Sequence, residues 1–165
     1  MKKCFFPLRW EIACAAINRK YSTCYGRWPV LAWGVLEWVS VNIIYIDDDA
    51  TNRALLREML AVEGIEMTEA GDALTGLKLI DKGRFDLIFM DLRMPDMNGL
   101  TAIRQLRASG SRQQATPIVV VTADPSEGVK SMCRSAGATD FLEKPVMMDK
   151  LFALIGSIRK QRAAG

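Results

Sequence analysis

From Asn42 onward the chain alternates between two patterns of apolar and polar residues. Short β-rich runs predict five strands, at residues 42–46, 65–69, 86–90, 117–121 and 139–142. Apolar residues with a helical period predict five helices, at residues 50–63, 73–82, 99–109, 126–136 and 147–160. Because the first, third and fourth strands are nearly all apolar, both faces of the sheet are expected to be covered. The alternation predicts an α/β fold, with a doubly wound five-stranded parallel sheet.

Residues on the helix surfaces and at the helix ends agree with this division. Apolar stripes are expected on two helices, formed by Leu55, Leu56, Met59 and Leu60 and by Leu151, Phe152, Leu154, Ile155 and Ile158. Glycines follow four helical patterns, where a left-handed residue commonly ends a helix: Gly64, Gly83, Gly110 and Gly137. Asp124 and Pro125 are expected to be the N-cap and the first residue of the fourth helix.

Residues 1–40 form an N-terminal extension that lacks a helical or strand period and holds all four tryptophans of the chain. Three interpretations stay open: a poorly ordered extension, a segment whose aromatic side chains pack on a partner, or a start assigned too early. In the third, Val39 or Val41 would be the alternative start, because the patterned domain begins at Asn42. We expect a main domain at residues 41–160 and a short C-terminal tail at 161–165.

The extension resembles a signal peptide and a membrane span, but it matches neither pattern fully. The first three residues resemble the start of a signal peptide, but Arg9 and Glu11 interrupt the apolar stretch that follows. Residues 28–46 are apolar and about long enough to span a membrane, but residues 42–46 are needed as the first strand. A cytoplasmic protein without a membrane anchor is therefore expected.

Charge and composition narrow the functional classes. The net charge of +3 arises in the extension, where six Lys/Arg face two Asp/Glu, so that 16 basic and 17 acidic residues remain for the rest. This balance gives no basic stripe for direct nucleic-acid binding. Histidine is absent, which excludes a His-based triad and a phosphohistidine in this chain. No two of the four cysteines have CxxC spacing, so a zinc knuckle or redox motif is not supported.

Polar residues end or follow four of the predicted strands, and the carboxyl ends of parallel strands meet along one edge of a sheet. These residues are Asp47 and Asp48, Asp91, Thr122 and Lys144. Clustered carboxylates repel one another unless a cation lies among them, and Mg²⁺ prefers carboxylate oxygens together with water and phosphate. The set predicts a site for a divalent metal ion and a phosphoryl group.

Each of these residues also has a purely structural interpretation. The acids after the first strand could cap a helix, Asp91 could be a turn residue, Thr122 could simply end a strand, and Lys144 could be a surface charge. In combination, Asp91 is the best candidate nucleophile, because a carboxylate can attack phosphorus to form an aspartyl phosphate. Thr122 and Lys144 would then bind phosphoryl oxygens. A cis bond before Pro145 would fix the direction of Lys144.

Four segments of the chain resemble a response-regulator receiver domain, in the order and at the spacing of that family. They are IDDDATNR from Ile46, MDLRMPDMNG from Met90, VVVTADP from Val119 and FLEKPV from Phe141. The resemblance covers residues 42–160 and implies a flavodoxin-like fold.

The resemblance also implies a metal site and a phosphoacceptor. Asp47 and Asp48 would bind Mg²⁺, with Asp91 and Arg93 completing the metal site. Asp91 would accept phosphate from a phosphohistidine on a sensor histidine kinase or on a histidine phosphotransfer protein. The product would be a phosphorylated signalling protein of a two-component system.

The resemblance further implies a switch. Thr122 and Lys144 would hold the phosphoryl group, and Phe141 would turn inward when Thr122 moves towards the phosphate. One added dianion would thereby bias a two-position element. The surface around the last two helices and the strand between them would then dock an unknown downstream protein. A plain core phenylalanine is the alternative interpretation of Phe141.

One position near the acceptor departs from the common family pattern, and two others correspond to positions that tune phosphate lifetime in the family. Asn98 stands where many members have Asp, a change that we expect to be tolerated. Arg93 lies two residues after the acceptor and Asp124 two after the threonine, at positions that tune phosphate lifetime in this family. We hypothesise that their opposite charges pair across the pocket mouth and shield the phosphoryl group.

We expect a single-domain receiver rather than an enzyme, with self-catalysed phosphotransfer and autodephosphorylation at most. Two alternatives stay open. A haloacid-dehalogenase-type phosphatase would use Asp47 as the nucleophile of a DxDxT motif with Asp49 and Thr51, but it leaves Asp91 unexplained. The second alternative is a receiver fold used only for docking and never phosphorylated.

Overall fold

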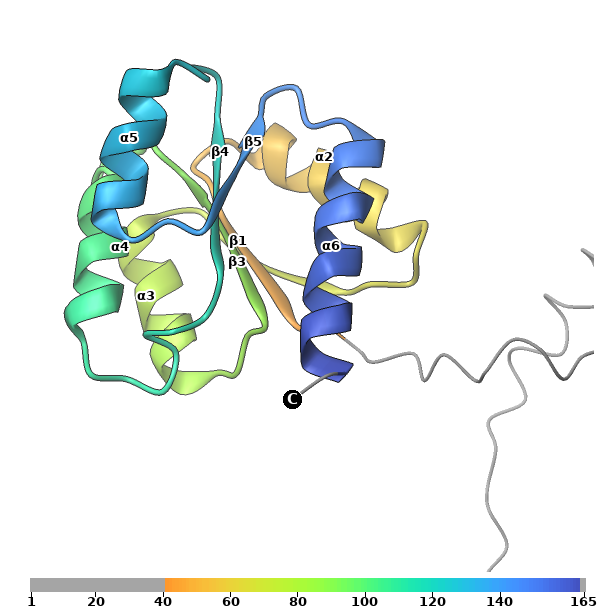
Figure 1. Ribbon diagram of the computed structural model, residues 1–165, viewed down its shortest axis with the longest axis horizontal. Helices are drawn as coiled ribbons and strands as arrows, with labels where there is room; N and C mark the ends of the chain where they lie inside the picture. Colours follow the sequence, from red (N-terminus) through yellow and green to blue (C-terminus); the bar gives the residue numbers. More distant parts are fainter. Residues whose placement is uncertain (1–40, 164–165) are drawn as a thin grey trace, which may run out of the picture. The chain divides into compact units, whose positions relative to one another are not determined.

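The computed structural model describes residues 41–163 (Figure 1). The strands are β1 (Ile43–Ile46), β2 (Met67–Ala70), β3 (Leu87–Asp91), β4 (Ile118–Thr122) and β5 (Asp140–Glu143). The helices are α2 (Ala50–Ala61), α3 (Ala73–Lys82), α4 (Gly99–Ala108), α5 (Glu127–Ala136) and α6 (Met148–Ala163). The extension at 1–40, with its interpretations as a signal peptide, membrane anchor or misassigned start, lies outside the described residues. Within the described range, no helix is long and apolar enough to cross a membrane.

The five strands form one parallel sheet in the order β2-β1-β3-β4-β5. The chain moves outward from β1 to the edge strand β2 and then returns to β3 on the other side of β1. This reversal is a topological switch point, where open α/β sheets bind ligands beyond the carboxyl ends of the strands. The predicted doubly wound parallel sheet is confirmed, and the strand order adds the position of its binding edge.

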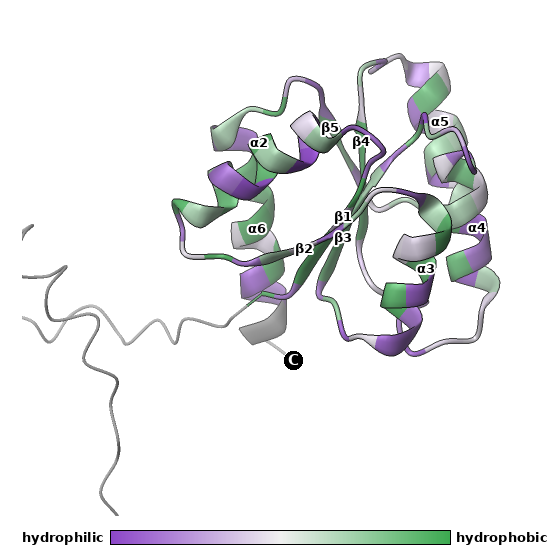
Figure 2. Cartoon of the chain, turned by 180° about the vertical axis from the view of Figure 1, so that it is seen from behind, coloured by the Kyte–Doolittle hydropathy of each residue, from purple (hydrophilic) through white to green (hydrophobic). Residues whose placement is uncertain are grey.

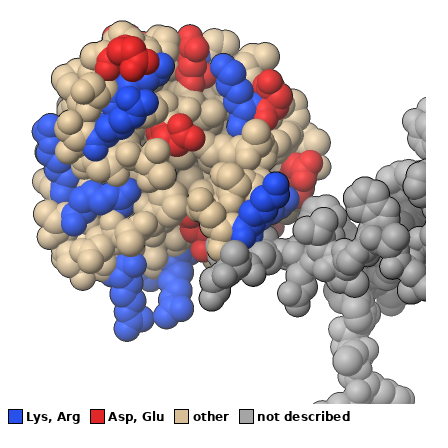
Figure 3. All heavy atoms as spheres, viewed as in Figure 1, with Lys and Arg blue, Asp and Glu red and all other residues tan. Residues whose placement is uncertain are grey.

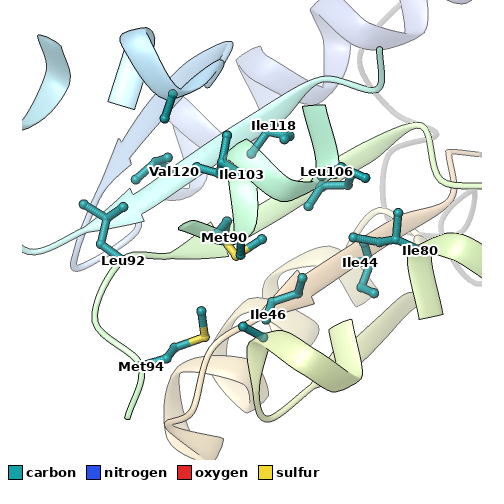
Figure 4. Close-up of a cluster of buried hydrophobic side chains, with 14 of the residues drawn as sticks. Ile44, Ile46, Ile80, Met90, Leu92, Met94, Ile103, Leu106, Ile118 and Val120 are labelled. Atoms are coloured by element: carbon teal, nitrogen blue, oxygen red, sulfur yellow. The ribbon is translucent and has the colours of Figure 1, made fainter. Parts of the chain in front are cut away.

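Helices cover both faces of the sheet (Figures 1 and 2). On one face, α3, α4 and α5 enclose a cluster of buried side chains that includes Ile44, Ile46, Ile80, Met90, Ile103 and Val120 (Figure 4). On the other face, α2 and α6 enclose a second cluster, which includes Tyr45, Leu56, Phe89, Val121 and Ile155. Every residue of β1, β3 and β4 is buried, as the continuous apolar runs predicted. Figure 3 shows acidic and basic side chains interspersed over the upper part of one face.

Four strands end one residue later than predicted. In β3, β4 and β5 the added residue is polar, because a polar side chain does not interrupt the backbone ladder. Asp91 pairs with Val121, and Thr122 pairs with Glu143, so these polar residues belong to the strands themselves. The predicted start of β2 at residue 65 is two residues early. The helices shift by one to three residues except α3, and α6 continues to Ala163 into the predicted tail.

The predicted N-cap of α5 is wrong. Ser126 is the N-cap, and the helix begins at Glu127. The Asp124 carboxylate instead accepts a hydrogen bond from the Ser126 backbone N–H, at 3.0 Å. An Asp side chain often closes such a local turn two residues ahead of itself, and this turn competes with helix capping.

Two further expectations about helices need correction. Gly83 has an extended backbone with φ −98°, unlike Gly64, Gly110 and Gly137, which are left-handed as predicted. Leu55 is 47% exposed and does not belong to the buried stripe of α2, whose buried members are Leu56 and Leu60. The buried surface of α2 is therefore narrower than its sequence indicates.

Candidate functional site

Three carboxylates meet at the switch point. Asp47 and Asp48 follow β1, and Asp91 is the last residue of β3. One oxygen of each carboxylate lies within 4.8 Å of an oxygen of the other two. Asp47 is fully buried and Asp91 is 5% exposed, whereas Asp48 is exposed to solvent. Three hard oxygen donors at such short range are the type of ligand set that suits Mg²⁺.

Lys144 joins two of these acids. Its Nζ donates to Asp47 Oδ2 and to Asp91 Oδ1, at 2.7 Å in each case. Burial acts to lower the pKa of Lys144, but the hydrogen bonds and charges of the two aspartates outweigh burial, and the pKa is raised. The ammonium is therefore charged at neutral pH and balances part of the acidic cluster. The bond between Lys144 and Pro145 is cis, as anticipated.

Thr122 ends β4 beside this cluster, and its hydroxyl faces the loop that follows. The hydroxyl accepts from the Asp124 backbone N–H at 3.1 Å and lies 3.4 Å from the Asp124 carbonyl oxygen. Its own carbonyl accepts from the Lys144 backbone N–H at 2.8 Å. The strand pairing thus places Thr122 next to Lys144, while its hydroxyl is engaged elsewhere than at Asp91.

Donors that the sequence did not single out surround the Asp47 carboxylate. The Tyr45 hydroxyl donates to Oδ2, and Asn52 Nδ2 lies 3.2 and 3.3 Å from the two oxygens. The Asp49 backbone N–H donates to Oδ1 at 2.9 Å. Tyr45 lies in a strand that is otherwise apolar and gave no polar signal. Asn52 lies within the IDDDATNR segment, and that position is the only signal that could have found it.

Asp49 has a structural role. It is the N-cap of α2, and its carboxylate accepts from the Thr51 backbone N–H at 2.7 Å. The hydrogen bond from Thr51 lowers the pKa of Asp49. Of the three consecutive acids, the last therefore follows the capping interpretation.

Arg53 holds the main chain of the acidic loop. Its Nη1 donates to the carbonyl oxygens of Asp47 at 2.7 Å and Asp48 at 3.1 Å. Its Nε donates to Glu69 on β2 at 3.3 Å, and Glu69 also pairs with Arg57. A guanidinium fixed in this way positions the two acids from α2, and the sequence analysis missed it.

The loop after β3 is fixed at both ends. Asp91 Oδ2 accepts from the Arg93 backbone N–H at 2.8 Å. A Cβ on Gly99 would lie 2.1 Å from the Asp91 carbonyl oxygen, so only glycine lets α4 begin so close to the strand. Between them, Asp96 Oδ2 accepts from the backbone N–H groups of Ala73 at 3.0 Å and Leu74 at 3.3 Å, at the start of α3.

Arg93 and Asp124 do not form an ion pair within 4.0 Å in the described part of the chain, so the predicted pairing is absent here. The pKa of Asp124 is lowered mainly by hydrogen bonds from Ser126, with a further contribution from the charge of Arg93. The two side chains therefore interact through longer-range attraction.

Phe141 is half-buried in β5 and packs against the cluster under α3, α4 and α5. The guanidinium carbon of Arg134 lies 5.3 Å from the centre of its ring. The exposure of the Phe141 ring is thus intermediate between that of a core residue and that of a surface residue.

The family model described as the response regulator receiver domain matches residues 43–156. The response regulator MprA of Mycobacterium tuberculosis is 34% identical over 123 residues, covering 74% of this chain and 52% of MprA. The cyclic di-GMP phosphodiesterase response regulator RpfG of Xanthomonas campestris is 31% identical over 133 residues, covering 79% of this chain and 35% of RpfG. The chain spans about half or less of the length of these relatives.

Among solved structures of similar fold, the match to this chain covers almost the whole length of the other protein. Chemotaxis protein CheY4 of Vibrio cholerae has a TM-score of 0.67 and 28% identity, covering 72% of this chain and 98% of CheY4. The receiver domain of sensor histidine kinase PA1611 from Pseudomonas aeruginosa has a TM-score of 0.67 and 27% identity, and the match covers 73% of this chain and 98% of that receiver domain. That structure has a magnesium ion coordinated in the active site cleft. Given the flavodoxin-like strand order and the matching family model, this chain belongs to the response regulator receiver domains of two-component systems.

Proposed function

We propose that Asp91 is the phosphoacceptor of this receiver domain and takes phosphate from a phosphohistidine on a partner protein. The observation that carries this proposal is the contact of Lys144 with Asp91 and Asp47 at the switch point. In the transfer, a carboxylate oxygen of Asp91 forms a bond to phosphorus while the bond from phosphorus to the partner's imidazole nitrogen breaks. The phosphoryl group changes carrier, and no oxidant or reductant is needed.

The contacts of Asp91 suit this attack. Its two oxygens are oriented by the Lys144 ammonium and by the Arg93 backbone N–H. Lys144 can move from Asp91 onto a phosphoryl oxygen without leaving Asp47, since it already contacts both acids. Thr122 is one strand away and would exchange its bond to the Asp124 loop for a phosphoryl oxygen.

Asp47, Asp48 and Asp91 would hold the Mg²⁺ ion, and their oxygen donors fit it. When bound, Mg²⁺ would offset the negative charge shared by these acids and the incoming phosphoryl group. Arg93 could contribute to the metal site only through its carbonyl oxygen, because a guanidinium has no lone pair to offer.

Exposed apolar side chains beside the site fit a protein donor. Leu55 on α2 is 47% exposed, and Met147 before α6 is 55% exposed. Leu55 also lines a small cavity of about 80 Å³ together with Lys144 and Val146. A sensor histidine kinase or a histidine phosphotransfer protein could pack on these side chains while presenting its phosphohistidine to Asp91.

The proposed switch links Thr122 to Phe141 across neighbouring strands. Movement of the Thr122 hydroxyl away from the Asp124 loop would free space beside β5, into which the half-buried Phe141 ring could turn. Its contact with Arg134 on α5 would then change. A downstream protein would bind the surface of α5, β5 and α6 differently once Asp91 is phosphorylated. We also propose that the protein acts in the cytoplasm.

Incubation with a small-molecule phosphodonor, with and without Mg²⁺, followed by peptide mapping tests the acceptor. We expect one phosphate on Asp91 with Mg²⁺ and almost none when the metal is chelated. Phosphate on Asp47 would instead support the phosphatase alternative. No phosphate on any residue, with Mg²⁺ present, would favour the docking-only alternative.

Arg93→Ala and Asp124→Ala are each expected to increase the rate of autodephosphorylation a few-fold. Each variant removes one of two opposite charges beside the site, which would restrict the approach of water if they drew together over the phosphoryl group in the phosphorylated protein. The measurement is loss of labelled phosphate over time at fixed Mg²⁺ concentration. Unchanged rates in both variants would refute the shielding hypothesis.

A further inference from the structure

Tyr45 is a buried tyrosine whose only polar group points into the acidic site. Its side chain is 1% exposed, and its ring packs edge-on against Phe89 with centres 6.2 Å apart. The hydroxyl donates to Asp47 Oδ2. A tyrosine hydroxyl is ordinarily protonated at neutral pH, so it acts towards the Asp47 carboxylate as a donor.

Three other groups donate to Asp47, one of them the Asp49 backbone N–H at 2.9 Å. Lys144 is divided between Asp47 and Asp91 at equal distances of 2.7 Å. Asn52 Nδ2 is 3.2 Å or more from both oxygens. Tyr45 and Asn52 are thus the described side chains that donate to Asp47 alone, and of the two only Tyr45 is buried.

We propose that Tyr45 is a positioning residue of the metal site, whose hydroxyl holds the Asp47 carboxylate in the arrangement that receives Mg²⁺. This inference rests on the proposed function of the acidic cluster. A fully buried carboxylate that loses a donor is held less firmly, so binding of an ion must also order it. The ring of Tyr45 fills the core, and its hydroxyl serves the site.

Tyr45→Phe isolates the hydroxyl, because the ring and its packing against Phe89 are retained. We expect the dissociation constant for Mg²⁺, measured by titration calorimetry on unphosphorylated protein, to rise roughly tenfold, as for other groups that orient metal ligands. Thr116→Val is the matched control, since it removes a buried hydroxyl bonded to Phe85 and Gln113, away from the acidic cluster. It should leave the Mg²⁺ dissociation constant unchanged.

A double-mutant cycle separates positioning from general destabilisation. If Tyr45 acts through Asp47, then Tyr45→Phe should add nothing to the loss of Mg²⁺ affinity caused by Asp47→Asn. A Tyr45→Phe dissociation constant within twofold of the wild type would overturn the inference. Equal losses with and without Asp47, or an equal loss in Thr116→Val, would also overturn it. A wild-type protein that binds no Mg²⁺ would refute the proposed metal site itself, and the inference with it.

Discussion

Asp91→Asn is expected to abolish phosphate incorporation from a small-molecule phosphodonor and from a phosphohistidine partner. The amide has nearly the same shape as the carboxylate, but it lacks the anionic oxygen that attacks phosphorus. Its single carbonyl oxygen can still accept from one of the two groups that contact Asp91, the Lys144 ammonium or the Arg93 backbone N–H, so part of the loop geometry should persist. The measurement is covalent phosphate per chain at saturating Mg²⁺, read by intact mass.

The matched control for this experiment is Asp81→Asn, which removes one exposed carboxylate on α3, outside the acidic cluster. It should be phosphorylated as fast as the wild type. Phosphate that still accumulates on Asp91→Asn, at any residue, would contradict the assignment of Asp91 as the sole acceptor. A peptide map of that product would show which carboxylate had been used.

Lys144→Met is expected to lower the free energy of unfolding by about 3 kcal/mol, because it leaves two buried carboxylates without their shared cation. The apolar stem of the lysine is replaced by a side chain of similar length, so the loss is mainly electrostatic. The difference in unfolding free energy between wild type and variant is measured by urea unfolding at pH 7 without Mg²⁺. Added Mg²⁺ should restore part of the lost stability in the variant, since the ion would supply the missing positive charge.

The pH dependence of this effect follows from the raised pKa of Lys144. A group whose pKa is higher in the folded protein contributes its full stabilisation below the ordinary lysine value of about 10.4. The contribution is lost as the pH rises through the higher folded value. The difference between wild type and Lys144→Met should therefore stay constant around neutral pH and shrink in strongly alkaline solution.

Lys150→Met is the control for both measurements, because Lys150 is an exposed lysine on α6. Its unfolding free energy should lie within about 0.5 kcal/mol of the wild type. A Lys144→Met variant that is as stable as this control would show that the contacts of Lys144 with Asp47 and Asp91 carry little energy.

The sequence predicted the parts of the site that lie at strand ends. Asp91 and Thr122 interrupt apolar runs, and parallel strands must bring such interruptions to one edge. The order of the strands has no local signal, because it depends on which strands pair across the whole domain. Asp48 and Lys144 could therefore be assigned to one edge of the sheet, but not to a particular distance.

The site residues that could not be predicted from the sequence lie at positions where an ordinary structural role already explains the residue type. Tyr45 satisfies the pattern of a buried strand, because its aromatic ring is apolar like the isoleucines around it and only its hydroxyl is polar. Arg53 occupies an ordinary polar position of α2, and its contacts are with carbonyl oxygens that no sequence pattern marks. Asp124 was misassigned because one carboxylate can close a turn or cap a helix, and local sequence allows both.

The carboxylate of Asp96 makes α3 dependent on the segment that leaves the acceptor strand. It receives two backbone N–H groups from the first turn of that helix, Ala73 and Leu74, which have few other acceptors at a helix start. If this segment shifts when Asp91 gains a phosphoryl group, the first turn of α3 would lose these two hydrogen bonds and keep only the one that the N-cap Asp72 accepts from Thr75. Phosphorylation would then loosen a helix beside β1 and β2, at the edge of the sheet opposite β5, giving the molecule a second place where its chemical state could be sensed.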